Sequence, residues 1–237
     1  RVAELSQRGQ SRRIQHLDYS RVFPTHNATP TSMTMDDAWH FYTMKSLAQK
    51  NWDKFFKSGK HCLPIKLYEK ELLDRLATHT KVVDLGCGDA SLGIEVGKHN
   101  LNYVGVDYST QAIERASINL KLFPNVELIQ ADINKLPTDQ RLLDAELIFI
   151  RFVLAHIDDK KGLLETAKKL LRPGGKIFIL SPIRPAGLTV NKDLEMISLV
   201  EGNIDLLCRE VGLSLEIIAE EHFPNEQSFL GAYLCQP

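Results

Sequence analysis

The chain has 237 residues, of which 43% are hydrophobic, and its formal net charge is −1. This size and composition allow one domain with an appendage or two small domains, and the charge gives no global attraction to nucleic acid or to a membrane. The four cysteines form no C-x-x-C pair, which argues against structural zinc and a disulfide framework, and for a cytoplasmic protein. No apolar run reaches the ~18 residues of a transmembrane helix, which argues against a membrane span.

The first part of the chain is interpreted as an appendage. Residues 1–35 carry five arginines but only two acidic residues, so this segment is either a solvated terminus or a basic arm for RNA or lipid. Aromatic residues gather in 36–57, where Trp52 with Phe55 and Phe56 indicates a helix. That helix is either a lid over a bound ligand or an ordinary part of the core.

Residues 81–93 organise the chain and read KVVDLGCGDASLG. Their apolar beginning predicts a strand buried on both faces. Gly86 and Gly88 then allow a tight turn whose backbone N–H groups can approach a ligand. Residues 91–99 can follow as a helix whose N-terminus points at that ligand. Asp84 lies at the end of the strand, which is where ligands bind in open α/β sheets.

A second carboxylate follows 21 positions after Gly86. Residues 102–106 predict the next strand, and Asp107 at its end can accept hydrogen bonds from two ribose hydroxyls. The glycine spacing, G-x-G-x-x-x-x-G, differs from the G-x-G-x-x-G of dinucleotide sites. Together these features predict a site for a nucleoside-bearing cofactor. The alternative is a strand, turn and helix followed by a solvated aspartate.

The rest of the chain alternates strands and helices, which predicts an α/β fold. Ser109 is suited to cap one of the helices, and the short link between the last two strands predicts an antiparallel hairpin. The remaining strands are expected at 126–130, 145–150, 176–180, 214–220 and 228–235. The remaining helices are expected at 67–76, with four leucines on one side, and at 110–120, 159–171 and 194–211.

Five segments resemble the class I S-adenosylmethionine-dependent methyltransferases, in the order and spacing of that family. They are VVDLGCGDASLG at 82–93, YVGVDYS at 103–109, IQADINKLP at 129–137, ELIFIRFVLAHIDD at 146–159 and LLRPGGKIFI at 170–179. One departure is Ala90, where many members have a third glycine. The resemblance covers roughly residues 65–237 and implies S-adenosylmethionine as the cofactor. It also implies a doubly wound, seven-stranded, mostly parallel sheet with an antiparallel last strand. Residues 1–64, which the resemblance does not cover, are expected to form an N-terminal extension with a helical lid.

The resemblance also implies roles by position. Asp107 would bind the ribose hydroxyls, and Asp132 would accept a hydrogen bond from the adenine amino group. The other cofactor-binding positions that it implies are Asp84, Gly86, Cys87, Gly88, Tyr108, Ile133, Arg151 and Phe152. A cofactor with a cationic sulfonium and an ammonium suits such a rim of carboxylates, whereas a pyrophosphate would favour bare N–H groups.

Candidates for the acceptor side follow from the chemistry of methyl transfer, which mainly needs alignment of the nucleophile and exclusion of water. A general base helps when the nucleophile begins protonated. His156, just past the fourth strand, is a candidate catalytic base and substrate-binding residue, or else a packing residue. Trp52 in the possible lid and Arg184 after the fifth strand are further substrate-binding candidates. No metal site is predicted.

Arg151, at the end of the fourth strand, is the second catalytic candidate. Its guanidinium could grip a carboxylate or phosphate of the substrate. It could instead pair with Asp84 or Asp132, and the sequence does not decide between these alternatives.

The sequence favours a small-molecule acceptor methylated at oxygen or nitrogen. Residues 150–153 read IRFV, not the Asn/Asp-Pro-Pro-aromatic motif of amino-methylating DNA enzymes, and no long insertion suggests a domain for target recognition. The arginine-rich start keeps a protein or RNA methyltransferase as an alternative, although the charge balance argues against nucleic acid. A non-catalytic cofactor-binding partner protein is the third hypothesis. Neither the acceptor nor the oligomeric state follows from the sequence.

Overall fold

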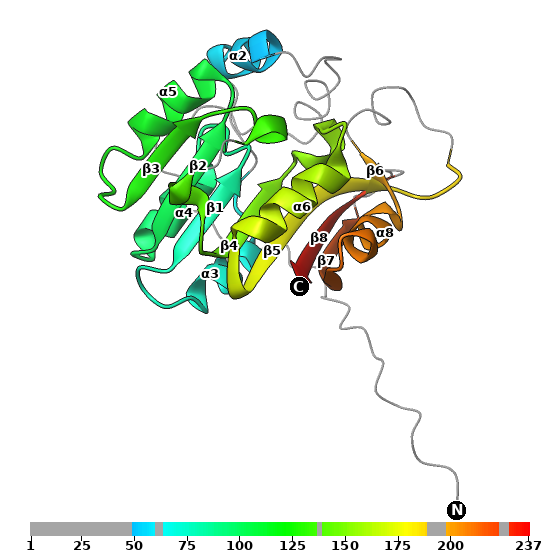
Figure 1. Ribbon diagram of the computed structural model, residues 1–237. Helices are drawn as coiled ribbons and strands as arrows, with labels where there is room; N and C mark the ends of the chain where they lie inside the picture. Colours follow the sequence, from blue (N-terminus) through cyan, green and yellow to red (C-terminus); the bar gives the residue numbers. More distant parts are fainter. Residues whose placement is uncertain (1–48, 60–63, 137–138, 189–197, 223–227) are drawn as a thin grey trace, which may run out of the picture. The chain divides into compact units, whose positions relative to one another are not determined.

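The computed structural model describes residues 49–59, 64–136, 139–188, 198–222 and 228–237 (Figure 1). Their centre is an eight-stranded sheet in the order β3-β2-β1-β4-β5-β8-β7, with the short β6 paired to β5. All pairings are parallel except those of β8, which is antiparallel to both neighbours, as predicted for the last strand. The strands are β1 (Lys81–Leu85), β2 (Asn102–Asp107), β3 (Val126–Gln130), β4 (Ala145–Arg151), β5 (Leu171–Arg184), β6 (Leu199–Val200), β7 (Ser214–His222) and β8 (Phe229–Gln236).

Helices cover both faces of the sheet, because successive side chains of a strand point to opposite sides. In β1, Val83 and Leu85 join the core cluster that includes α6 and α8, while Val82 joins the cluster that includes α3, α4 and α5. This is the predicted doubly wound arrangement, and Figure 1 shows α6 and α8 on the same face. The helices are α2 (Gln49–Lys57), α3 (Leu67–Asp74), α4 (Ser91–Lys98), α5 (Thr110–Asn119), α6 (Lys160–Leu170) and α8 (Asn203–Glu210).

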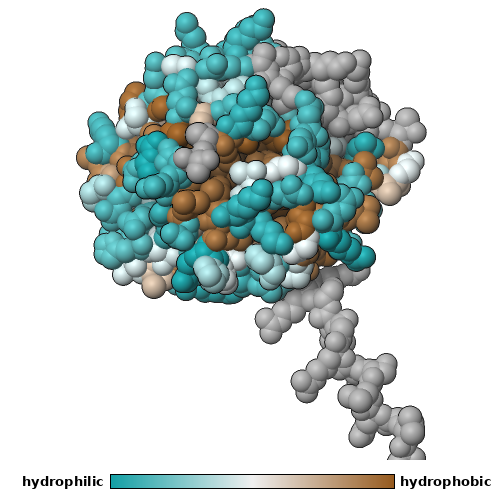
Figure 2. Space-filling model, in the orientation of Figure 1, coloured by the Kyte–Doolittle hydropathy of each residue, from teal (hydrophilic) through white to brown (hydrophobic). Residues whose placement is uncertain are grey.

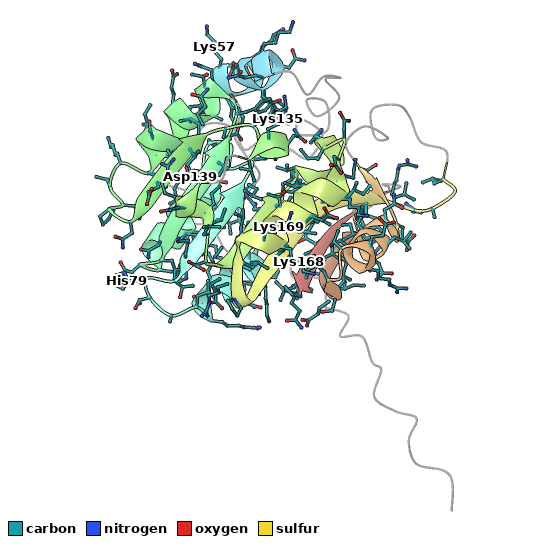
Figure 3. All side chains as sticks on the ribbon, in the orientation of Figure 1. Lys57, His79, Lys135, Asp139, Lys168 and Lys169 are labelled. Carbon is teal, nitrogen blue, oxygen red and sulfur yellow. The ribbon has the colours of Figure 1, made fainter. Side chains whose placement is uncertain are left out.

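Polar and glycine residues set several helix ends. The Ser109 Oγ accepts a hydrogen bond from the Ala112 N–H at 3.1 Å, so Ser109 caps α5 as predicted. Gly212 follows α8 with a left-handed φ of +68°. Lys168 of α6, labelled in Figure 3, donates to the carbonyls of Val211 and Gly212 at 2.8 and 3.0 Å. Its ammonium therefore satisfies carbonyl groups just past the end of α8 and ties the two helices together.

The helix predicted at 194–211 begins only at Asn203. Leu199 and Val200 pair with β5 instead, and Gly202, with φ +82°, turns the chain from that strand into the helix. The apolar spacing alone could not separate this two-residue strand from the first turn of a helix. The first four residues of the predicted helix lie outside the described residues.

Two further expectations need correction. β5 begins at Leu171 rather than at 176, because Leu171 already pairs with Ala145 of β4. Regular pairing then resumes at Lys176 with Leu147, and a register shift accommodates the extra residues of β5 between these two pairs. The leucines of α3 do not all face the core: Leu73 is 1% exposed, whereas Leu67 is 65% exposed at the first turn. A charged residue of that first turn is buried instead, as described below.

The surface drawn in Figure 2 is mostly hydrophilic, with hydrophobic residues between the polar ones. Within the described ranges, none of the helices combines the length and the apolar character needed to cross a membrane. The same residues bring no three His, Cys, Asp or Glu side chains together in a group that could hold a metal ion.

Candidate functional site

The turn between β1 and α4 is held against the neighbouring strand. The N–H groups of Gly86 and Cys87 both donate to the Val106 carbonyl, at 2.8 and 2.9 Å. Gly86 has φ +81°, and a Cβ atom there would collide with the Val153 side chain. The turn therefore requires glycine both for its backbone conformation and for its close contact. This places the main chain directly at the wall of a pocket.

The pocket lies at the carboxyl ends of β1, β2 and β4. Every cofactor-binding position predicted from the sequence lines it, and so do Trp52 and His156. The structure thus brings together residues that are up to about 100 positions apart in the chain. Phe55 and Phe56, from the helix considered as a lid, also line the pocket. The sequence analysis missed three further lining residues: Asn134, Val153 and Ile157. Two of these three are apolar, and nothing in their local pattern distinguishes a pocket wall from core.

Asp84 places a buried carboxylate beside the glycine turn. The residue is 2% exposed, and its Oδ2 accepts a hydrogen bond from the Tyr103 hydroxyl at 2.8 Å. Its Oδ1 has no hydrogen-bond partner among the described residues. Burial raises the pKa of this carboxyl to about 7, although the nearby Arg151 guanidinium and Tyr103 act to lower it. The Asp84 carboxylate is thus an acceptor at the pocket wall that suits a cationic group.

Asp107 joins the glycine turn to the start of α5. Its Oδ2 accepts from the Gly88 N–H at 3.0 Å and its Oδ1 from the Ser109 N–H at 2.9 Å. Burial raises the pKa of the Asp107 carboxyl to about 6, and these hydrogen bonds act against the rise. Just past β3, the Asp132 Oδ1 accepts from the Asn134 N–H at 3.0 Å. Carboxylates at or near the ends of β1, β2 and β3 therefore line one pocket.

Arg151 lies in the pocket wall, with a partner that the sequence analysis did not consider. Its Nε donates to Glu69 Oε1 at 2.5 Å, and its Nη2 donates to Glu69 Oε2 at 3.3 Å. Glu69, on α3, is fully buried, and Arg151 is 7% exposed. The two residues are 82 positions apart, so no local pattern could have revealed the ion pair.

The helix α2 forms another wall and packs on α5. Phe55 and Phe56 are each 4% exposed and form a small core with Ala112 of α5. Arg115 of α5 donates to the Phe56 carbonyl at 2.7 Å. Trp52, on the same helix, lines the pocket. Phe55 and Phe56 thus belong to a small core, and they line the pocket together with Trp52. The role of this helix as a lid stays a prediction, and residues 36–48 of the expected lid lie outside the described residues.

Asp53 fastens α2 to the start of α5, because its Oδ1 accepts from the Ser109 hydroxyl at 2.6 Å and from the Gln111 N–H at 3.3 Å. We expect Asp53→Ala to lower the free energy of unfolding by about 1 kcal/mol. Urea denaturation measures this change. The control is Asp205→Ala, which removes an exposed i,i+4 pair with Arg209 on α8 and should cost only about 0.3 kcal/mol. Equal losses in both variants would contradict the fastening role.

His156 ends the 3-10 turn η4 (Leu154–His156) and contacts Trp52. The two ring centroids lie 5.3 Å apart with the ring planes at 82°. Burial lowers the pKa of the imidazole to about 4, and the nearby Lys160 ammonium adds to the effect. The imidazole is therefore neutral at physiological pH. In this position His156 packs against an aromatic ring and also presents a neutral imidazole to the pocket.

Phe152 has a strained backbone. Its φ is +56°, which an aromatic residue rarely adopts, and its N–H donates to the Leu180 carbonyl at 2.7 Å. The Arg151 Cζ lies 5.8 Å from the centroid of its ring. Strain of this kind gathers at functional sites. Here it sets an aromatic ring in the pocket wall directly after β4.

Arg184 is the one predicted site residue that is not among those lining the pocket. It is the last residue of β5 and pairs with Val200 of β6. The residues at 189–197, which follow soon after it, are not described. Its role in substrate binding stays a prediction.

The sequence profile of a family described as a methyltransferase domain matches residues 76–224. A carboxy-S-adenosyl-L-methionine synthase of Shewanella halifaxensis is 37% identical over 112 residues, 44% of each chain. A demethylmenaquinone methyltransferase of Staphylococcus saprophyticus is 29% identical over 109 residues, 45% of this chain and 46% of that one. A ubiquinone biosynthesis O-methyltransferase of Cupriavidus pinatubonensis is 26% identical over 181 residues, 74% of this chain and 68% of that one. The matched part thus spans less than half the length of the first two relatives.

Solved structures share the fold at low sequence identity. A SAM-dependent methyltransferase from Aquifex aeolicus has a TM-score of 0.58 at 18% identity, covering 77% of this chain and 97% of that one. The [4+2]-cyclase SpnF has a TM-score of 0.63 at 13% identity, covering 79% of this chain and 94% of that one. At such identities the likeness concerns the fold alone.

Proposed function

Since the chain belongs to the methyltransferase-domain family, among the class I S-adenosylmethionine-dependent methyltransferases, we propose that it transfers the methyl group of S-adenosylmethionine to an oxygen or nitrogen nucleophile of a small-molecule acceptor. The observation that carries the proposal is the set of carboxylates, Asp84, Asp107 and Asp132, that lines one pocket around the glycine turn. Such a site favours a ligand with a sulfonium and an ammonium group over a pyrophosphate.

In this proposal each carboxylate holds one part of the cofactor. Asp107 accepts hydrogen bonds from the ribose hydroxyls, because each of its oxygens keeps acceptor capacity beyond the backbone N–H that it already binds. Asp132 accepts from the adenine amino group, with Tyr108 and Ile133 against the ring. Asp84 and the turn at 86–88 take the methionine part, since the Asp84 Oδ1 has no other partner among the described residues.

The chain's contribution to the chemistry is alignment and exclusion of water. The cofactor, when bound, supplies a methyl group already activated by the sulfonium. Phe152 and Arg151 border the place where that methyl group would lie, and Trp52 shields it from solvent. His156 is neutral at physiological pH and can accept the proton that the nucleophile loses.

The acceptor atom is proposed partly from the relatives. The ubiquinone biosynthesis O-methyltransferase is matched over 74% of this chain, which favours oxygen over nitrogen as the nucleophile. The described pocket is lined by buried and half-buried side chains and is not a broad charged surface, which favours a small molecule over RNA or protein.

Calorimetry with S-adenosylmethionine, S-adenosylhomocysteine and NAD tests the cofactor. We expect the first two to bind and NAD not to bind; binding of NAD alone would contradict the proposal. Release of S-adenosylhomocysteine in the presence of small hydroxylated or amino compounds, followed by mass spectrometry of the methylated product, then tests the transfer itself.

The affinity for S-adenosylmethionine should rise with pH. The pKa values of Asp84 and Asp107 are raised to about 7 and about 6, so both carboxyls lose their protons between acidic and mildly alkaline pH. The cationic methionine part at Asp84 and the ribose hydroxyls at Asp107 both stabilise the deprotonated carboxylates, so binding releases protons and becomes stronger as pH increases. We expect the dissociation constant to be at least about fivefold lower at about pH 8 than at about pH 5.

Calorimetry across this interval measures the effect, and Asp84→Asn is the comparison variant, because it removes one of the two titrating groups. Its affinity should vary less with pH than that of the wild type. A wild-type affinity that falls with rising pH would contradict the assignment of these carboxylates to the cofactor.

A further inference from the structure

The pocket has a distinct side next to β4, away from the carboxylates of β2 and β3. Trp52 reaches this side from α2, and the chain from 152 to 157 supplies the rest of it. We call this side the acceptor wall; it consists of Trp52, Phe152, Val153, His156 and Ile157. Four of these five side chains are hydrophobic, and the fifth is an imidazole whose burial keeps it neutral. The acceptor wall therefore offers an apolar, largely aromatic surface.

The charges of the pocket oppose an anionic ligand. Among the described lining residues, Arg151 is the only one with a permanent positive charge, and buried Glu69 pairs with it through two hydrogen bonds. Asp84, Asp107 and Asp132 add three carboxyl groups. An acceptor with a carboxylate or phosphate would lose its hydration here, and the cationic side chain that lines the described pocket is already paired with a buried carboxylate.

The aromatic rings of the acceptor wall favour a flat ligand. Phe152 is held by its strained backbone, with its N–H bound to the Leu180 carbonyl. Trp52 is held by its edge-to-face contact with His156 and by its ring contacts with Phe55 and Phe56. Rings fixed in this way gain contact energy with another aromatic ring beyond what area burial alone gives, and they lose little entropy on binding.

Resting on the proposed function, we propose that the acceptor is an uncharged aromatic hydroxyl compound, bound against the acceptor wall with its hydroxyl towards the methyl group of the cofactor. In the transfer, the hydroxyl oxygen bonds to the methyl carbon while the carbon–sulfur bond breaks and its electron pair stays on sulfur. The hydroxyl proton leaves to a base, for which His156 is the candidate. An aromatic hydroxyl is more acidic than an aliphatic one, which lessens the demand on the base.

Three compounds with the same fused two-ring carbon skeleton test the proposal on the wild-type protein saturated with S-adenosylhomocysteine. They are 2-naphthol, its carboxylated counterpart 6-hydroxy-2-naphthoate, and the saturated decahydro-2-naphthol. By calorimetry we expect 2-naphthol to bind at least about tenfold more tightly than either of the other two. Equal or tighter binding of the carboxylate would overturn the charge argument, and equal binding of the saturated ring would overturn the aromatic one.

Binding of none of the three compounds would also overturn the inference. In all these cases S-adenosylhomocysteine still binds, so the proposed function stands. If neither S-adenosylhomocysteine nor S-adenosylmethionine binds, the proposed function and the inference about the acceptor are both contradicted. The two failures are therefore distinguishable in the same experiment.

Glu69→Gln tests the charge argument within the chain, because it removes the negative partner of Arg151 while keeping its shape. We expect the preference for 2-naphthol over the carboxylate to shrink at least about fivefold. The control is Glu146→Gln, which breaks the ion pair with Arg172 near the opposite end of β4 and should leave the preference unchanged. An unchanged preference in folded Glu69→Gln would contradict the argument; if that variant does not fold, the wild-type series decides.

Discussion

Replacing Asp107 with alanine should raise the dissociation constant for S-adenosylhomocysteine about tenfold to several hundredfold, because hydrogen bonds to a charged acceptor contribute roughly 1.5–3 kcal/mol each. The structure adds a second reason for the loss. Both oxygens of Asp107 accept backbone N–H groups, one from Gly88 and one from Ser109. The alanine variant therefore also loosens the glycine turn and the start of α5. Isothermal titration calorimetry measures the affinity.

Asp139→Ala is the matched control, because the Asp139 Oδ1 accepts a backbone N–H from Arg141 in a short turn that does not line the pocket. Asp139 is labelled in Figure 3, on the stretch of chain before β4. Its replacement should leave the affinity within about twofold of the wild type. An Asp107→Ala protein that is folded and binds S-adenosylhomocysteine as tightly as the control would show that Asp107 is not the ribose ligand.

Replacing Trp52 with alanine should reduce the rate of methyl transfer by roughly a hundredfold, because a misplaced acceptor and admitted water both act on the reacting atoms. Trp52 contacts His156 in the acceptor wall and also contacts Phe55 and Phe56 of its own helix. Its indole is thus the part of α2 that reaches from α5 to the residues after β4. Single-turnover measurements with saturating S-adenosylmethionine separate the transfer step from binding.

Trp52→Phe keeps an aromatic ring and should retain the rate within about tenfold. Phe55→Ala is the contrasting variant: Phe55 is 4% exposed, so we expect it to lower the free energy of unfolding by about 3–5 kcal/mol. If Trp52→Ala loses stability to the same degree and keeps its transfer rate, Trp52 is core and not a cover.

The parts of the fold that could be predicted are those with a local cause. β3 runs from Val126 to Gln130 in both prediction and structure, and the helix predicted at 159–171 is α6, Lys160–Leu170. Such features act over a few positions only: runs of valine and isoleucine, glycine turns and capping residues. Their effect can therefore be predicted from the residues next to them in the sequence. The positions of Asp84 and Asp107 in one pocket followed from the same logic, because parallel strands end at the same edge.

What could not be predicted depends on residues far apart in sequence. Glu69 looks like an ordinary polar residue of a helix, and only the packing of α3 on the sheet buries it beside Arg151. Leu67 fits the apolar stripe of the same helix, yet it is exposed because α3 meets the sheet with its later residues. A sequence pattern states which residues can share a face, whereas the tertiary contacts decide which face is covered.

The place of β8 in the sheet has a consequence for how the protein is made. β8 comes after β7 along the chain but lies between β5 and β7 in the sheet. While residues 229–236 are still unmade, the newly synthesised β5 has an open edge and β7 has nothing to pair with among the other described strands. Such an unpaired edge invites association with other chains. We therefore expect a chain whose β8 has not yet paired to be the form most prone to associate with other chains along β5.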